Sequence, residues 1–84
     1  MLNCCLLEGK VRDSKKENDV FMVVVETVQD EKKSCFYVKT YGQLAKFCEE
    51  KYNYGRKIRV VGKLDQGVNG VFINAENIDF DIAM

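Results

Sequence analysis

The chain has 84 residues, of which 13 are Lys or Arg and 13 are Asp or Glu, and it contains no His, Pro or Trp. A formal charge of zero is not the strongly basic balance typical of nucleic-acid-binding domains, although it leaves room for a local basic surface. The absence of His removes the usual neutral-pH acid-base group and the commonest metal ligand. We therefore expect neither an enzyme nor a metal or cofactor site.

The length predicts one domain, covering residues 1–84. A domain of this size buries only roughly 60 to 65% of its unfolded-chain surface, so its core is thin and oligomerisation is a reasonable expectation. No stretch approaches the roughly 20 apolar residues of a membrane span, and no charged-then-apolar leader opens the chain. We expect a cytoplasmic protein without a membrane partner.

The four cysteines stand inside apolar runs: Cys4, Cys5, Cys35 and Cys48. Free Cys behaves as a small hydrophobe in such surroundings, so buried reduced thiols are the favoured interpretation. A disulfide or a metal role is the alternative.

The first half of the chain predicts three strands. Residues 2–12 are apolar up to Glu8 and resume after Gly9, which indicates a long strand bent where the residue lacks a Cβ. A charged connection is expected at residues 13–19. Residues 20–28 are rich in β-branched residues and predict the second strand.

The third strand is predicted at residues 34–41, after a loop at residues 29–33. Because strand side chains alternate, Phe36 and Val38 should share one face. The other face then carries Cys35, Tyr37, Lys39 and Tyr41.

The second half predicts a helix and two strands. Residues 43–51 have Leu44, Phe47 and Cys48 at helical spacing. A strand at residues 56–64 should face inward with Ile58, Val60 and Leu64, and outward with Lys57, Arg59 and Lys63. A hairpin at residues 65–70, with the turn pair Asn69-Gly70, leads to a last strand at residues 71–82.

Five strands with one short helix between the third and fourth are in the order of an OB-fold, a five-stranded Greek-key β-barrel. A ferredoxin-like sheet would need two helices, and an SH3-like barrel would not need this one. We assign four aromatic residues to the core: Phe21, Phe36, Phe47 and Phe80.

The first predicted strand is apolar on both faces, with Leu2, Cys4 and Leu6 opposite Cys5, Leu7 and Val11. One barrel interior covers only one face, so something else should bury the other. Pairing of this strand with its copy would do so and would remove an exposed edge. We predict a dimer or larger assembly with Leu2, Cys4 and Leu6 at the interface.

Four short segments, taken in order, carry a likeness to a known family. They are residues 2–11 (LNCCLLEGKV), 36–45 (FYVKTYGQLA), 60–64 (VVGKL) and 75–80 (AENIDF). These resemble the first, third, fourth and last strands of the bacterial single-stranded-DNA-binding (SSB) protein family, including small members of the primosomal replication protein B type. The resemblance implies a homodimer or homotetramer that binds single-stranded DNA in replication, recombination or repair, with replication proteins as further partners.

The chain departs from the family pattern at the stacking aromatics. The resemblance places them at four positions, and this sequence keeps the aromatic only at Tyr41. The other three positions hold Gln29, Cys35 and Asn69.

Single-strand binding without sequence readout needs cations along a groove and aromatic faces for base stacking. The candidate nucleic-acid-binding residues are Lys10, Arg12, Tyr37, Lys39, Tyr41, Arg56, Arg59 and Lys63. Ordinary cross-strand pairing is the alternative for the tyrosines, and a solvated face or edge protection is the alternative for the cations.

Two functions therefore stay open: single-stranded DNA binding, or an OB-fold assembly module of a replication complex with little nucleic-acid affinity. Net neutrality and the missing aromatics favour the second. The charge is unevenly distributed, however, because residues 65–84 hold four acidic groups and none of the 13 basic ones. Neutrality is thus no argument against nucleic-acid binding, but it predicts weaker and more salt-sensitive binding than a basic protein of this fold would show.

Overall fold

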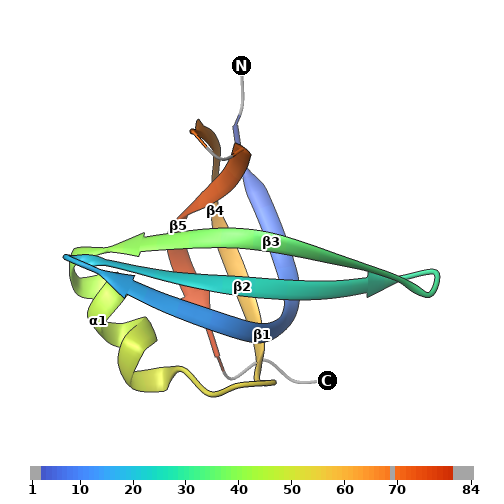
Figure 1. Cartoon of the computed structure of the whole chain (residues 1–84), viewed down its shortest axis with the longest axis horizontal. Coiled ribbons are helices and arrows are strands. Elements are labelled where there is room, and N and C mark those ends of the chain that lie inside the picture. Colours follow the sequence, from blue (N-terminus) through green and yellow to red (C-terminus); the bar gives the residue numbers. More distant parts are fainter. Residues whose placement is uncertain (1–2, 69, 81–84) are drawn as a thin grey trace.

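Five strands and one helix form a closed barrel in the computed structural model, which describes residues 3–68 and 70–80 (Figure 1). The elements are β1 (Cys5–Glu17), β2 (Val20–Gln29), β3 (Lys32–Tyr41), α1 (Gly42–Lys51), β4 (Lys57–Gly67) and β5 (Gly70–Asp79). The strand order is β1-β2-β3-β5-β4, with β4 returning to β1. All neighbouring pairs are antiparallel except β3 and β5. The predicted OB-fold is confirmed.

Strand β1 is long because it serves two neighbours in turn. It pairs with β4 over Cys5–Lys10 and with β2 from Lys10 onward, with a register shift between Val11 and Asp13. The strand passes so close to β2 at Gly9 that a Cβ there would collide with the carbonyl oxygen of Glu26. The change of partner at Lys10 agrees with the predicted bend near Gly9.

The predicted connection at residues 13–19 is wrong, because β1 continues to Glu17 and only Asn18 and Asp19 form the turn. Polar residues of this segment pair with the valine-rich start of β2. The ladder supplies their backbone hydrogen bonds, and their side chains stay largely exposed beyond the core. Charge alone therefore did not mark the end of the strand.

The barrel interior is filled by inward residues of all five strands and by one side of α1. The buried apolar set is Leu7, Val11, Phe21, Val23, Val25, Val38, Ala45, Cys48, Ile58, Val60, Ile73, Ile78 and Phe80. The only buried polar residue among those described is Thr40, whose hydroxyl donates a 2.7 Å hydrogen bond to the carbonyl of Phe21. The core is closed without an unsatisfied hydroxyl.

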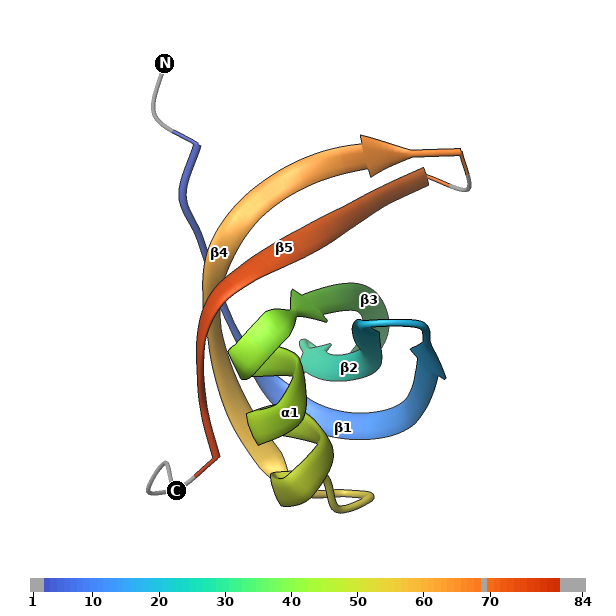
Figure 2. The ribbon, with the colours of Figure 1, turned by 90° about the vertical axis from the view of Figure 1, so that its left-hand side faces the viewer.

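Two hairpins extend past this core. Their projection explains why the assignments of Phe36, Leu64 and the connection at residues 65–70 are wrong. Phe36 and Leu64 are exposed, although both were expected to face inward. Figure 1 shows the β2–β3 hairpin, and Figure 2 the β4–β5 hairpin, reaching beyond the body of the barrel. Strand β4 runs on to Gly67, so the predicted connection at residues 65–70 is shorter than expected.

Phe47 on α1 was also assigned to the core, but it is partly exposed. Its ring meets the Phe80 ring edge-on, with ring centroids 5.8 Å apart.

The cysteines are free, but only Cys48 is buried. Cys4 and Cys35 are exposed and Cys5 is intermediate, so the expectation of burial is wrong for the first two. Cys35 lies on β3 before its pairing with β5 begins at Val38, on the outward side of the projecting hairpin. An apolar run in the sequence does not distinguish this position from an enclosed one.

Candidate nucleic-acid interface

The register of β2 with β3 assembles one outward surface from six residues. Tyr41 pairs with Val20, Lys39 with Met22, and Tyr37 with Val24. We call these six residues the β2–β3 face. The predicted aromatic–cation–aromatic series of Tyr37, Lys39 and Tyr41 is therefore present on one side of β3, next to an apolar strip on β2.

Both tyrosines present ring surface to solvent. Tyr37 is 51% exposed and Tyr41 is 49% exposed. Four residues of extended chain separate them, which corresponds to roughly 14 Å. Each ring could stack on a base without displacing a core side chain, since nucleobases of any sequence have a flat aromatic surface.

A row of outward residues crosses all five strands at the level of Lys39. Lys63 pairs with Asn74, Asn74 with Lys39, Lys39 with Met22, and Met22 with Lys15. We call this set the lateral row. With neighbouring strands about 4.8 Å apart, its four steps span roughly 19 Å. Three ammonium groups thus follow one line across the outside of the barrel.

The lateral row includes residues that the sequence reasoning did not select, namely Lys15, Met22 and Asn74. Strand β5 adds another missed residue, Phe72. The Nζ atom of Lys39 lies 4.1 Å from the centroid of the Phe72 ring, a cation–π contact. Alternation along residues 71–74 could have indicated that Phe72 and Asn74 point to the side opposite Ile73.

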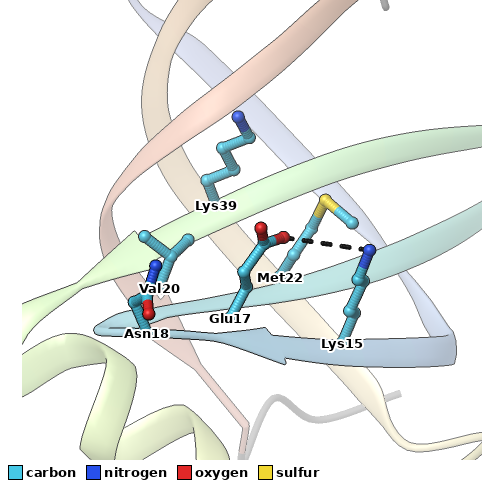
Figure 3. A pocket seen from close by; sticks show the side chains of 6 residues that line it. All are labelled: Lys15, Glu17, Asn18, Val20, Met22 and Lys39. Atoms are coloured by element: carbon cyan, nitrogen blue, oxygen red, sulfur yellow. Dashed lines mark ion pairs between the residues drawn. The ribbon is translucent and has the colours of Figure 1, made fainter.

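A shallow cavity of about 260 Å³ lies on this surface, between the start of β2 and Lys39. Its lining combines apolar and charged groups: Lys15, Glu17, Asn18, Val20, Met22 and Lys39 (Figure 3). The ammonium of Lys15 is 3.8 Å from the Glu17 carboxylate, and both side chains are largely exposed. Such an exposed ion pair contributes little to stability, and it separates easily when a phosphate approaches the lysine.

The remaining predicted cations lie elsewhere, so the expected set is divided. Arg59 bonds the carboxylate of Glu8 at 3.1 Å on the outside of the β1–β4 pair. Arg56 donates hydrogen bonds to the carbonyls of Phe80 and Lys51 at 3.2 and 3.3 Å, which ties the end of α1 to the end of β5. These two hydrogen bonds orient the Arg56 guanidinium at the barrel end.

Arg12 and Lys10 belong to the bent part of β1. The Arg12 guanidinium is 3.2 Å from Glu26 and 5.5 Å from the centroid of the Tyr54 ring. Desolvation lowers the pKa of Arg12, but attraction to Glu26 and a hydrogen bond to Tyr54 outweigh it, so the pKa is raised. Lys10 is exposed and pairs across the ladders with Glu26 and Lys57. Neither residue joins the lateral row.

No group of three or more Cys, Asp or Glu in residues 3–68 and 70–80 could hold a metal ion. In the described part of the chain, no helix is long and apolar enough to cross a membrane.

The fold and the outward strand surface define the chain as an OB-fold barrel with an aromatic and basic face. Solved structures of bacterial single-stranded DNA binding proteins are among its structural neighbours. A small single-stranded DNA binding protein from Mycoplasma pneumoniae matches with a TM-score of 0.82 and 24% identity, over 100% of this chain and 99% of that one. The second single-stranded DNA binding protein of Mycobacterium smegmatis matches with a TM-score of 0.79 and 18% identity, over 98% and 95%.

A third neighbour is the N-terminal domain of PriB from Thermoanaerobacter tencongensis, described as dimeric. It matches with a TM-score of 0.75 and 19% identity, over 96% of this chain and 98% of that one. Comparison of the sequence itself with protein-family models and with curated proteins gave no match. The similarity thus establishes the fold over nearly the whole chain.

Proposed function

We propose that this protein is a non-catalytic single-stranded-DNA-binding protein that acts through the β2–β3 face of one OB-fold domain. The observation that carries the proposal is the crossing of Tyr37, Lys39 and Tyr41 on β3 with the lateral row. Stacking surfaces and phosphate-binding cations meet at Lys39, which is the combination that sequence-independent strand binding requires. The three structural neighbours, each 24% identical or less, support the proposal through their shared fold.

Two kinds of interaction supply the affinity. Each base stacked on an aromatic ring contributes about 1 to 3 kcal/mol. Each phosphate neutralised by Lys15, Lys39 or Lys63 releases counterions and adds about −0.7 to the slope of log K against log salt. A duplex would present phosphates without free base faces, so the tyrosines would find no partner in it.

Fluorescence anisotropy with labelled oligo-dT, oligo-rU and duplex across a salt series tests the proposal. We expect tighter binding of single strands than of duplex and a slope of about −2 for three neutralised phosphates. No binding to any oligonucleotide at low salt would contradict the proposal and would favour the assembly module instead.

The proposal includes a role in replication, recombination or repair, contacts with replication proteins and a cytoplasmic location.

Self-association through β1 is a second part of the proposal. Leu6 is 64% exposed and Cys4 is exposed, while Leu2 lies outside the described residues. Strand β2 pairs with β1 only from Lys10 onward, so the preceding segment has one edge without a strand partner in residues 3–68 and 70–80. A second copy could pair there and cover Leu6.

Light scattering at micromolar concentration measures this association. We expect a dimer or tetramer for the wild type and a monomer for Leu6→Glu, because a carboxylate in an apolar interface is costly to desolvate. Val68→Glu, at a fully exposed turn position, is the matched control and should keep the wild-type mass. A monomeric wild type would overturn this part.

A further inference from the structure

A second basic site lies on β1 and β4, away from the lateral row. Lys10 and Lys57 face each other directly in the antiparallel β1–β4 ladder. Like charges at directly opposed positions repel and destabilise a sheet. None of the ion pairs found among the described residues involves either lysine. Neither lysine therefore has a salt-bridge partner among the described residues, and Glu26 lies opposite Lys10 on the β2 side.

The two lysines line a cavity of about 320 Å³, together with Gly9, Arg12 and the carboxylates of Glu8 and Glu26. Both carboxylates already have cationic partners. Glu8 is 3.1 Å from Arg59, and Glu26 is 3.2 Å from Arg12. The charge that remains available to a ligand in the cavity is therefore that of the two ammonium groups.

We propose that this cavity binds one phosphate group between Lys10 and Lys57. A tetrahedral anion there would accept hydrogen bonds from both ammonium groups and remove their repulsion. The source that the geometry favours is a phosphodiester of a bound strand. Glu26, the β2 neighbour of Lys10, follows Met22 of the lateral row by four residues along β2, which is roughly 13 Å. A strand of several nucleotides reaches from one site to the other.

This inference rests on the proposed function for the source of the phosphate, so the first experiment varies oligonucleotide length. Anisotropy titrations compare dT oligomers of four and sixteen nucleotides on the wild type and on Lys10→Gln/Lys57→Gln. We expect Lys10→Gln/Lys57→Gln to bind the longer oligomer about fivefold more weakly than the wild type does at 0.1 M salt. This is the factor that a slope of ~0.7 gives for a tenfold change in salt, from about 1 M to 0.1 M. The affinity for the shorter oligomer should be unchanged. The charge-matched control is Lys46→Gln/Lys51→Gln on α1, which should affect neither oligomer.

A second experiment tests the cavity without any nucleic acid. Pyrophosphate that binds only the folded site stabilises the folded protein and raises its melting temperature. At matched ionic strength, we expect this rise to be a few degrees larger for the wild type and for the α1 control than for Lys10→Gln/Lys57→Gln. Equal shifts in all three proteins, together with no length-dependent loss, would overturn the inference. A pyrophosphate effect without a length effect would support the phosphate site and overturn the strand as its source. Failure of both oligomers to bind the wild type would refute the proposed function and leave pyrophosphate to decide on the cavity.

Discussion

Replacement of Tyr37 by Ala isolates the stacking contribution of the β2–β3 face. The ring is 51% exposed and pairs across the strand with Val24, so its removal leaves no cavity in the core. Complete stacking of one base is worth about 1 to 3 kcal/mol. Because roughly half of the ring is accessible, we expect the lower part of this range, about 1 to 2 kcal/mol, which is a loss of about 5- to 30-fold in affinity.

Anisotropy with oligo-dT across a salt series measures both the affinity and its salt dependence. Tyr37→Ala should lower the affinity and leave the slope unchanged, since the phenol neutralises no phosphate, whereas Lys39→Gln should reduce the slope by about 0.7. Tyr37→Phe keeps the ring and should bind like the wild type.

The control for a general effect of tyrosine loss is Tyr54→Ala. Tyr54 is 66% exposed, but its ring contacts Arg12, which does not belong to the β2–β3 face. We expect less than a twofold change. An unchanged affinity for Tyr37→Ala together with a large loss for Tyr54→Ala would refute the choice of face.

Two further predictions concern packing and thiol chemistry. Ile58→Val should lower the free energy of unfolding, measured with urea, by about 0.5 to 1.5 kcal/mol because Ile58 is fully buried. Leu64→Ala, at a 49% exposed site, should change it by less than about 0.5 kcal/mol. Equal losses for the two variants would contradict the assigned core. Burial raises the pKa of the Cys48 thiol to about 11, although a hydrogen bond with Thr40 opposes the shift. The neutral thiol therefore stabilises the fold fully below pH 9, and this contribution should be lost as the pH rises from about 9 to 11, a decline that Cys48→Ala should lessen. With a thiol reagent at pH 8, the exposed Cys4 should react quickly and Cys48 only after unfolding; rapid reaction of Cys48 in the folded protein would contradict its burial.

The order of elements was predictable because each one has a strong local signal. The valines of β2, the alternation in β3 and the helical spacing around Cys48 all agree with the structure. The extent of the strands was not predictable. Residues 13–17 have the composition of a loop, and their membership of β1 depends on pairing with β2, a contact between distant segments.

The candidate site was predictable along one strand but not across strands. Tyr37, Lys39 and Tyr41 could be selected because period-two alternation places them on one side of β3. Lys39 lies in one row with Lys63, Asn74 and Lys15 because of the register of four strand pairs, including the parallel contact of β3 with β5. Nor could the sequence show that the Arg56 guanidinium bonds two backbone carbonyls at the barrel end, since these belong to Lys51 and Phe80.

Chemical-shift mapping of the labelled protein with oligo-dT shows directly whether a single strand lies on the β2–β3 face. We expect the largest perturbations to fall on Tyr37, Lys39 and Tyr41, to extend to Lys63, and to leave the exposed side of α1 unchanged. Perturbations centred on α1, with the β2–β3 face unaffected at saturating oligonucleotide, would rule out strand binding on this face.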